Sequence, residues 1–447
     1  MAQSRPLSGF LTPDVIQQVK DALRAYGGRG ALFLGNFFVS KVIAYFGPLV
    51  LAAVLSAQHY GELELALSIA MMLALFAVFG VANALPQLVL LRNPVPVKDI
   101  LAILTGGASA VFLVAGAIIL IFTGNLVWAL ACCITTLTTI QYSASAYAKT
   151  HSLRNIATWV DNFTLVTATI LGVGLAAMGY GHSPTLAPML IVFAVLAVAC
   201  TAACFYIAKT TWQPHMIDRL KRAMRLGAPL IIMTIFSSWV AAAAGRTLIG
   251  FTLPIEDMAL YAFLFRIASL ALVIHYMIST AFYAPFYSMS ARRFEQIIPF
   301  YLAFVACVCA TFAIGVPLLL PYLPSNVLTP ETITVGQHIF PVLALNIYGV
   351  NVSASLESRV QRVRRVTWGT LNAAIVSSLV AAAFIALAHY HLLSLRAAVW
   401  LITAQTLICT LRYMDVLARR GMYMPKVATV VCCAYAALGV LALLLGG

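Results

Sequence analysis

The sequence predicts an all-α integral membrane protein, and three observations support this fold class. Hydrophobic residues make up 62% of the 447-residue chain and charged residues only 9%, whereas a soluble domain carries roughly a quarter charged residues. The apolar residues come in blocks of about 20 or more, the length that a helix needs to cross the hydrocarbon of a bilayer. Lys and Arg gather in alternate connections between these blocks. A soluble globule is therefore excluded.

Thirteen apolar blocks are expected to form membrane helices. The first series of six covers 31–55, 63–91, 100–122, 126–148, 156–180 and 186–208. The second series of six covers 226–253, 258–282, 297–323, 339–356, 368–391 and 397–413. The basic stretch 209–225 joins the series as a cytoplasmic linker, and a further apolar helix is expected at 427–445. Residues 31–208 and 226–413 are thus expected to form two six-helix lobes.

The placement of the basic residues predicts that the amino terminus lies in the cytoplasm. Alternate connections carry most Lys and Arg residues, among them Arg92, Lys149, Arg359 and the stretch 209–225. Arg396 is the only base in the intervening connections, which otherwise hold Glu62, Glu64, Glu256, Asp257 and Glu331. This asymmetry is the positive-inside pattern. The net charge of +14 is therefore assigned to topology, and no nucleic-acid partner is expected.

The amino-terminal segment, residues 1–30, is expected to lie on the cytoplasmic surface of the membrane. It lacks the apolar core of a cleavable signal peptide. Residues 11–29 instead place an apolar stripe on one helical face, as interfacial helices do. The stripe consists of Val15, Ile16, Val19, Leu23 and Tyr26.

The two series resemble each other, which predicts a parallel pseudo-repeat. Residues 13–24 (PDVIQQVKDALR) precede the first series and match residues 214–225 (PHMIDRLKRAMR), which precede the second. Residues 55–70 align with 253–268 without a gap. Six helices lie between the paired points, so the repeats have the same orientation. Such repeats are a transporter architecture with the substrate site at their interface, so we expect the lobes to face each other across a central cavity.

Loose apolar motifs at corresponding places in the two halves carry a resemblance to a known family. They include Leu55, Ser56, Tyr60, Gly61, Gly80, Arg246, Ile249, Gly250, Tyr261 and Ile267. Over residues 11–413 the chain resembles the multidrug/oligosaccharidyl-lipid/polysaccharide superfamily. Within it, the chain is most similar to the bacterial O-antigen and polysaccharide-type flippases of lipid-linked oligosaccharides.

The resemblance implies a transporter of the bacterial cytoplasmic (inner) membrane that alternates access between its two sides. Its cargo would be an anionic polyprenyl-diphosphate-linked oligosaccharide, moved from the cytoplasmic to the outer leaflet. Membrane lipids and other polysaccharide-assembly membrane proteins are the implied partners. No cofactor is implied, and a proton or sodium gradient is the candidate driving force.

Two features depart from the family pattern. The family often has an Asp directly before the arginine of the seventh crossing, where this chain has Gly245 before Arg246. The sequence therefore leaves the partner of Arg246 open. The block 427–445 would make a thirteenth crossing and place the carboxyl terminus outside, unless it lies along the interface.

Three bases within the apolar blocks are the candidate substrate-binding residues: Lys41, Arg246 and Arg266. Lys41 and Arg266 lie about nine or ten residues from a block end, close to mid-depth at 1.5 Å per residue. A central charge costs roughly 2.5–3.5 kcal/mol, so we expect these side chains to face a wet cavity or a counter-ion. Snorkelling to the interface or a structural ion pair is the alternative, chiefly for Arg246. Arginine suits a diphosphate because its fork matches phosphate oxygens.

Two titratable residues are candidates for a counter-ion or an ion-coupling role. Asp161 is the one acid clearly inside an apolar block, where it would neutralise one of the bases or couple transport to protons or sodium. His275 in the eighth block would relay a proton, unless it only satisfies its own hydrogen bonds.

Two other functions compete with the flippase hypothesis. An ion-coupled multidrug antiporter of the same superfamily would need buried carboxylates to attract cations, and three bases against one acid disfavour it. A membrane glycosyltransferase or polymerase would need a loop that presents acids, His or a metal. No metal site is expected, because the nine cysteines lack metal-ligand spacing. The chain is therefore expected to be no enzyme and to have no catalytic residue.

The charge distribution yields a prediction about topology. A cysteine placed at Glu256 should react with a membrane-impermeant maleimide added to intact cells, because this connection faces outward. A cysteine placed at Arg365 should not react. The unmodified chain, with its nine cysteines, controls for background labelling. Labelling at Arg365 in intact cells would overturn the topology.

Overall fold

The computed structural model describes residues 13–89, 97–179, 186–213, 215–234, 245–281, 289–362 and 367–446. These residues form helices joined by short connections, and no strand occurs among them. Nine of the described helices are long and apolar enough to cross a membrane, or ten if the bent pair α6 and α7 counts as one crossing. The all-α membrane fold expected from the sequence is confirmed.

The first half of the chain forms helices that pack around a central one. They are α1 (Pro13–Val54), α2 (Ala57–Ala77), α3 (Val81–Val89), α4 (Lys98–Thr123), α5 (Leu126–Thr150), α6 (Arg154–Val160), α7 (Phe163–Ala177) and α8 (Ala187–Thr210). Helix α5 packs against α2, α4 and α8, whereas α1 packs against α6 and α7.

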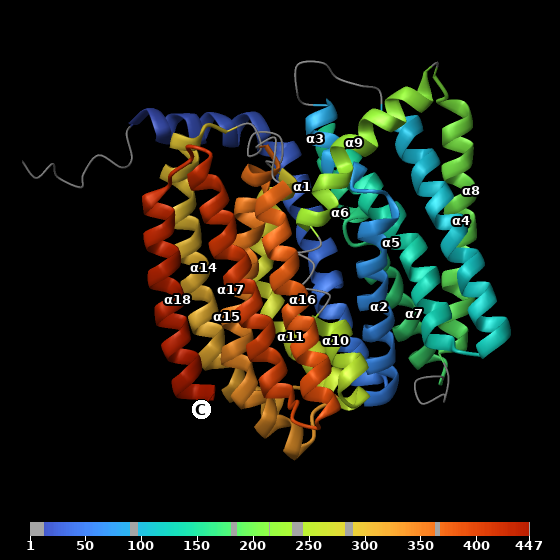
Figure 1. The fold of residues 1–447 in the computed structure, drawn as a ribbon, viewed down its shortest axis with the longest axis vertical. Coiled ribbons are helices and arrows are strands. Elements are labelled where there is room, and N and C mark those ends of the chain that lie inside the picture. The colour runs from blue at the N-terminus through green and yellow to red at the C-terminus, as the bar shows by residue number, and fades with distance from the viewer. Residues whose placement is uncertain are drawn as a thin grey trace, which may run out of the picture.

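The second half has its own central helix, α15. Its elements are α9 (Met216–Thr234), α10 (Gly245–Thr252), α11 (Ile255–Ala268), η4 (Ser269–Leu272), α12 (Val273–Ala281), α14 (Ala291–Leu319), η5 (Leu320–Tyr322), α15 (Pro330–Arg362), α16 (Thr367–His389), α17 (Leu395–Arg419) and α18 (Pro425–Gly446). Helix α15 packs against α11, α14, α17 and α18. The two halves stand side by side, with α1, α10 and α11 where they meet (Figure 1).

The helices differ from the predicted blocks in several places, and the block 63–91 is not one helix but two, α2 and α3. The block 258–282 is not one helix but α11, the 3-10 turn η4 and α12, and the block 156–180 is bent by 49° between α6 and α7. Helix α2 begins at Ala57, because the Ser56 side chain caps it by accepting a hydrogen bond from the His59 N–H (3.2 Å). The predicted crossing at 226–253 is only partly described, since 235–244 lie outside the described residues.

The start of α1 and the end of α18 lie at opposite ends of the bundle (Figure 1). The first part of α1 runs across one end before the helix turns into the bundle. At the other end, the 22-residue helix α18 finishes after packing along α14 and α15. The block 427–445 therefore forms a helix of crossing length. Whether this helix makes a thirteenth crossing or lies along the interface stays a prediction.

The halves meet where α2 packs against α10 and α11, at the end predicted to face outward. The approach is close: a Cβ on Gly61 would lie 2.6 Å from the Ile255 carbonyl oxygen, a contact that only glycine allows. About two turns further along α2, the hydroxyl groups of Ser68 and Thr247 form a hydrogen bond of 2.6 Å. Both hydroxyls are buried.

A second connection between the halves closes the same end of the bundle. Asn326, in the loop before α15, donates from Nδ2 to the carbonyl oxygens of Ala53 (2.9 Å) and Leu55 (3.0 Å). These carbonyls end helix α1 and have no partner within that helix. We call this connection, together with the α2 packing on α10 and α11, the outer contact.

The close approach at Gly61 predicts a steric effect of a single methyl group. Gly61→Ala should destabilise the protein by about 1–3 kcal/mol, because the obstructing atom is backbone and cannot rotate away. Gly107→Ala is the matched control: a Cβ at Gly107 meets nothing within 4 Å, so this change should be neutral or stabilise by up to about 1 kcal/mol. Thermal unfolding in one detergent compares them, and equal midpoints for the two variants would contradict the prediction.

Candidate functional site

A cavity of about 440 Å³ lies between the two halves of the chain. Side chains from α1, α2, α5, α10, α11 and α12 line it, together with the break between α6 and α7. Its charged lining residues are Lys41, Lys149, Asp161, Arg246 and Arg266. All three bases that the sequence singled out for binding therefore line one cavity. Their role in binding stays a prediction.

Arg246 and Arg266 are bonded to one carboxylate, Glu64. Arg266 donates from Nε to Glu64 Oε1 and from Nη2 to Glu64 Oε2, both at 2.9 Å. Arg246 donates from Nη1 to Glu64 Oε2 at 3.0 Å. The exposed fractions are 1% for Glu64, 1% for Arg246 and 6% for Arg266. Both guanidinium groups form their bonds to Glu64 inside the bundle. Neither arginine side chain therefore snorkels to the membrane interface.

The sequence analysis placed Glu64 in an outer connection, and this was wrong. Since α2 begins at Ala57, Glu64 lies two turns inside the helix. Asp161 is therefore not the only acid within the described crossings. The sequence did carry a signal that Glu64 lies within a helix. Glu64 stands between Leu63 and Leu65 and follows Tyr60 by one helical turn, so Tyr60 and Glu64 share one helix face.

The surroundings of the three charges are apolar or weakly polar. The Tyr60 hydroxyl donates to Glu64 Oε1 (3.4 Å), and the Phe265 ring lies 5.0 Å from the Arg246 guanidinium carbon. One carboxylate neutralises one of the two arginines, so the group keeps one net positive charge. Glu64 comes from the first half of the chain and both arginines from the second, so the bonds join the halves.

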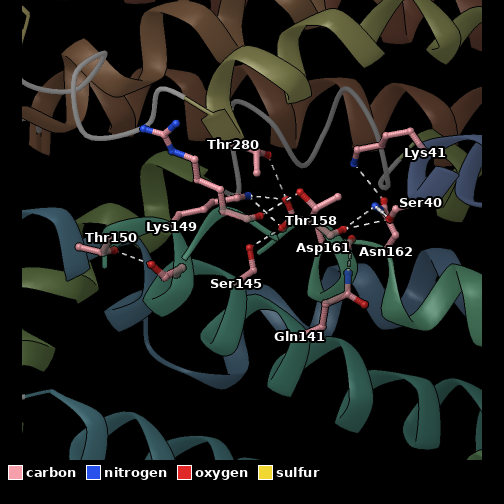
Figure 2. Close-up of polar contacts among 12 residues, drawn as sticks. Ser40, Lys41, Gln141, Ser145, Lys149, Thr150, Thr158, Asp161, Asn162 and Thr280 are labelled. Carbon is pink, nitrogen blue, oxygen red and sulfur yellow. Dashed lines mark hydrogen bonds and ion pairs between the residues drawn. The ribbon is translucent and has the colours of Figure 1, made fainter. Parts of the chain in front are cut away.

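Asp161 stands at the break between α6 and α7, in a second polar network (Figure 2). Its carboxylate forms an ion pair with Lys149 (2.8 Å) and accepts hydrogen bonds from Ser145 and from Thr280 (3.4 Å). Lys149 lies in the last turn of α5. The partner of Asp161 is therefore Lys149 and not one of the three candidate binding bases.

Gln141, which the sequence analysis did not single out as a site residue, holds the break together. Its Nε2 donates to the Asp161 carbonyl oxygen (2.8 Å), and its Oε1 accepts from the Thr164 N–H (3.0 Å) and hydroxyl (2.6 Å). The Asp161 carbonyl and the Thr164 N–H are backbone groups that an interrupted helix leaves open. A side-chain amide satisfies both because it carries a donor and an acceptor.

Lys41 is a buried cation with neutral neighbours. Its Nζ donates to Asn162 Oδ1 (3.0 Å) and lies 4.7 Å from the centre of the Tyr276 ring. Asn162 in turn donates to Ser40 (2.7 Å), as Figure 2 shows. No described carboxylate lies within ion-pair distance of Lys41. The Lys41 ammonium group therefore offers its charge to the cavity.

His275 is placed differently from the other candidates. Its ring lies 6.3 Å from that of Tyr301 on α14, centre to centre. His275 is not among the described residues that line the cavity. The structure thus brings together four of the five predicted residues, and a relay role for His275 stays a prediction.

Comparisons with known proteins add little to this geometry. No family model matches the chain, and no curated protein matches it. Among solved structures, the chain is similar to that of the eukaryotic MATE transporter AtDTX14, at 12% sequence identity and a TM-score of 0.34. The match covers 89% of this chain and 100% of that one. At this TM-score the similarity supports no conclusion about the site.

The network around Asp161 predicts that this residue acts as a counter-ion. Asp161→Asn should destabilise the protein by about 1–3 kcal/mol, because Lys149 loses a charged partner in a partly buried site. Adding Lys149→Met should recover part of the loss, since the two effects are coupled. Thermal unfolding of the two single variants and the double variant measures this. Transport that keeps its rate but becomes indifferent to a proton or sodium gradient would instead assign Asp161 to coupling.

Proposed function

We propose that this chain is a flippase that moves an anionic polyprenyl-diphosphate-linked oligosaccharide from the cytoplasmic to the outer leaflet by alternating access. The observation that carries the proposal is the charge of the cavity. Four cations line it, namely Lys41, Lys149, Arg246 and Arg266. Two carboxylates, Asp161 and Glu64, are bonded to these cations, so four minus two leaves two net positive charges.

This charge suits a diphosphate that links a lipid to a sugar, because each of its phosphates carries one negative charge. Arginine binds phosphate oxygens through parallel N–H bonds, whereas a lysine ammonium group is a point charge. Arg246 and Arg266 would hold one end of the diphosphate, and Lys41 would attract the other. The aromatic side chains of Tyr45, Tyr142 and Tyr276 also line the cavity and would face the sugar or lipid next to the phosphates.

The position of the closed contact supports loading from the cytoplasmic side. The outer contact closes the bundle where α1 ends and α2 begins, which the charge pattern predicts to face outward. The lining of the cavity extends in the other direction to Lys149, in the last turn of α5. The structure is therefore assigned to the state that would accept cargo from the inner leaflet.

An ion-coupled multidrug antiporter is the second candidate, and one observation favours it. Besides the half-buried Asp161, the described crossings contain the buried carboxylate Glu64, and aromatic residues line the same cavity. Against this function, both carboxylates are already engaged by bases. An organic cation would also enter a cavity with net positive charge. The flippase function fits this charge better, and it requires no catalytic residue.

Substitution of Arg266 tests the proposed function. In cells that depend on this chain for surface glycan, Arg266→Ala should abolish glycan display, because loss of one charge-assisted bond removes about 1.5–3 kcal/mol of binding. Arg266→Lys should keep partial activity, since the positive charge remains but the two-pronged geometry of the guanidinium group is lost. Arg396→Ala, a change at an exposed residue in the first turn of α17, is the matched control and should display glycan normally. Normal display by both Arg266→Ala and Arg266→Gln at matched membrane levels would refute an anion site at this residue.

A further inference from the structure

The bonds to Glu64 occupy the groups of Arg246 and Arg266 that would bind a phosphate. Among the described residues, Arg266 donates through Nε and Nη2, and both donate to Glu64. This is the two-pronged geometry by which a guanidinium group binds either a carboxylate or a phosphate. The arginines line the cavity, whereas Glu64 is not among the described residues that line it. A phosphate that enters the cavity therefore meets two arginines that already hold a carboxylate.

The same bonds cross between the halves of the chain. Glu64 lies on α2, and Arg246 and Arg266 lie on α10 and α11, the three helices that pack in the outer contact. The hydrogen bond between Ser68 and Thr247 lies one turn from Glu64 along α2. Parting α2 from α10 and α11 must break the bonds to Glu64. The arginines would then be buried without a counter-ion, which is strongly unfavourable.

We propose that Glu64 is a specificity-determining residue that competes with the cargo. In the empty protein its carboxylate takes the place of a phosphate on Arg246 and Arg266, and it thereby holds the outer contact closed. A cargo diphosphate replaces Glu64 on the arginines, after which α2 can separate from α10 and α11. This inference rests on the proposed flippase function, and it adds a reason why cargo and opening are linked.

The competition also selects the cargo. A neutral lipid or a free sugar has no charge with which to displace a carboxylate from two arginines. A diphosphate brings two charges and several oxygens, so it can satisfy both arginines while Lys41 neutralises the rest. Opening without cargo is suppressed for the same reason, because Asp161, the carboxylate among the described lining residues, is held by Lys149.

Binding of a diphosphate to variants of Glu64 tests the competition directly. The probe is farnesyl diphosphate, titrated into the purified full chain. Glu64→Gln should bind it about ten- to hundredfold more tightly than the unmodified chain, because the competing charge is gone while the shape is kept. Glu62→Gln is the matched control, since Glu62 lies on the same helix but is bonded to Gln58 at the surface. Its affinity should not change.

A second measurement keeps Glu64 in place, so the test does not depend on the folding of Glu64→Gln. Thr247→Cys introduces a thiol in the outer contact, where Thr247 is 4% exposed. Its labelling by an impermeant maleimide should rise severalfold when farnesyl diphosphate is added to the chain with Glu64. In the double variant Thr247→Cys, Glu64→Gln, labelling should be high without the diphosphate. The unmodified chain gives the background from its own cysteines.

The outcomes separate the inference from the proposed function. Tighter binding by Glu64→Gln, or diphosphate-dependent labelling of Thr247→Cys, supports the competition. If the unmodified chain binds the diphosphate, but Glu64→Gln binds no more tightly and labelling does not respond, the inference is wrong and the flippase function stands. If neither the unmodified chain nor Glu64→Gln binds the diphosphate, both are wrong.

Discussion

The carboxylate of Glu64 between two arginines is the interaction on which the junction of the two halves depends. A buried ion pair is costly to break, because removal of one partner leaves the other charge buried alone and costs about 3–5 kcal/mol. The partners of Glu64 lie 182 and 202 residues away along the chain. The packing of α2 against α10 and α11 brings all three charges together. Separating these helices would leave buried charges unpaired, so the ion pairs stabilise the packing.

The cavity beside this junction has two unlike ends. At one end, planar guanidinium groups are held rigidly by Glu64 and by the Phe265 ring. At the other, the flexible side chains of Lys41 and Lys149 lie among amide, hydroxyl and carboxylate groups. A guanidinium fork gives geometric selectivity, whereas a lysine gives charge with little demand on geometry. Such a division suits a cargo that must be recognised at one end and released from the other.

The broken crossing of α6 and α7 shows how polar backbone is accommodated at membrane depth. A helix can be interrupted there only if other groups satisfy the freed N–H and C=O groups. Gln141 does so with one amide, and the break then places the Asp161 carboxylate beside Lys149. A continuous helix would keep these backbone groups for its own hydrogen bonds. The break is thus part of the site.

The sequence by itself determined the membrane fold, most helix positions and three of the four bases that line the cavity. These follow from local quantities: the length of an apolar block, and the cost of a charge in its middle, as for Lys41 and Arg266. The cap at Ser56 is also local, but its consequence for Glu64 was missed, because a carboxylate near a block end suggests a connection. Only the tertiary structure decided the partners. Glu64 with Arg246 and Arg266, Asp161 with Lys149, and Gln141 with the break all depend on which helix faces meet. The pattern along a single helix carries no information about which face of another helix it meets, whether that helix is 12 residues away, as for Lys149 and Asp161, or 202, as for Glu64 and Arg266. The charges could therefore be located from the sequence while their pairing could not.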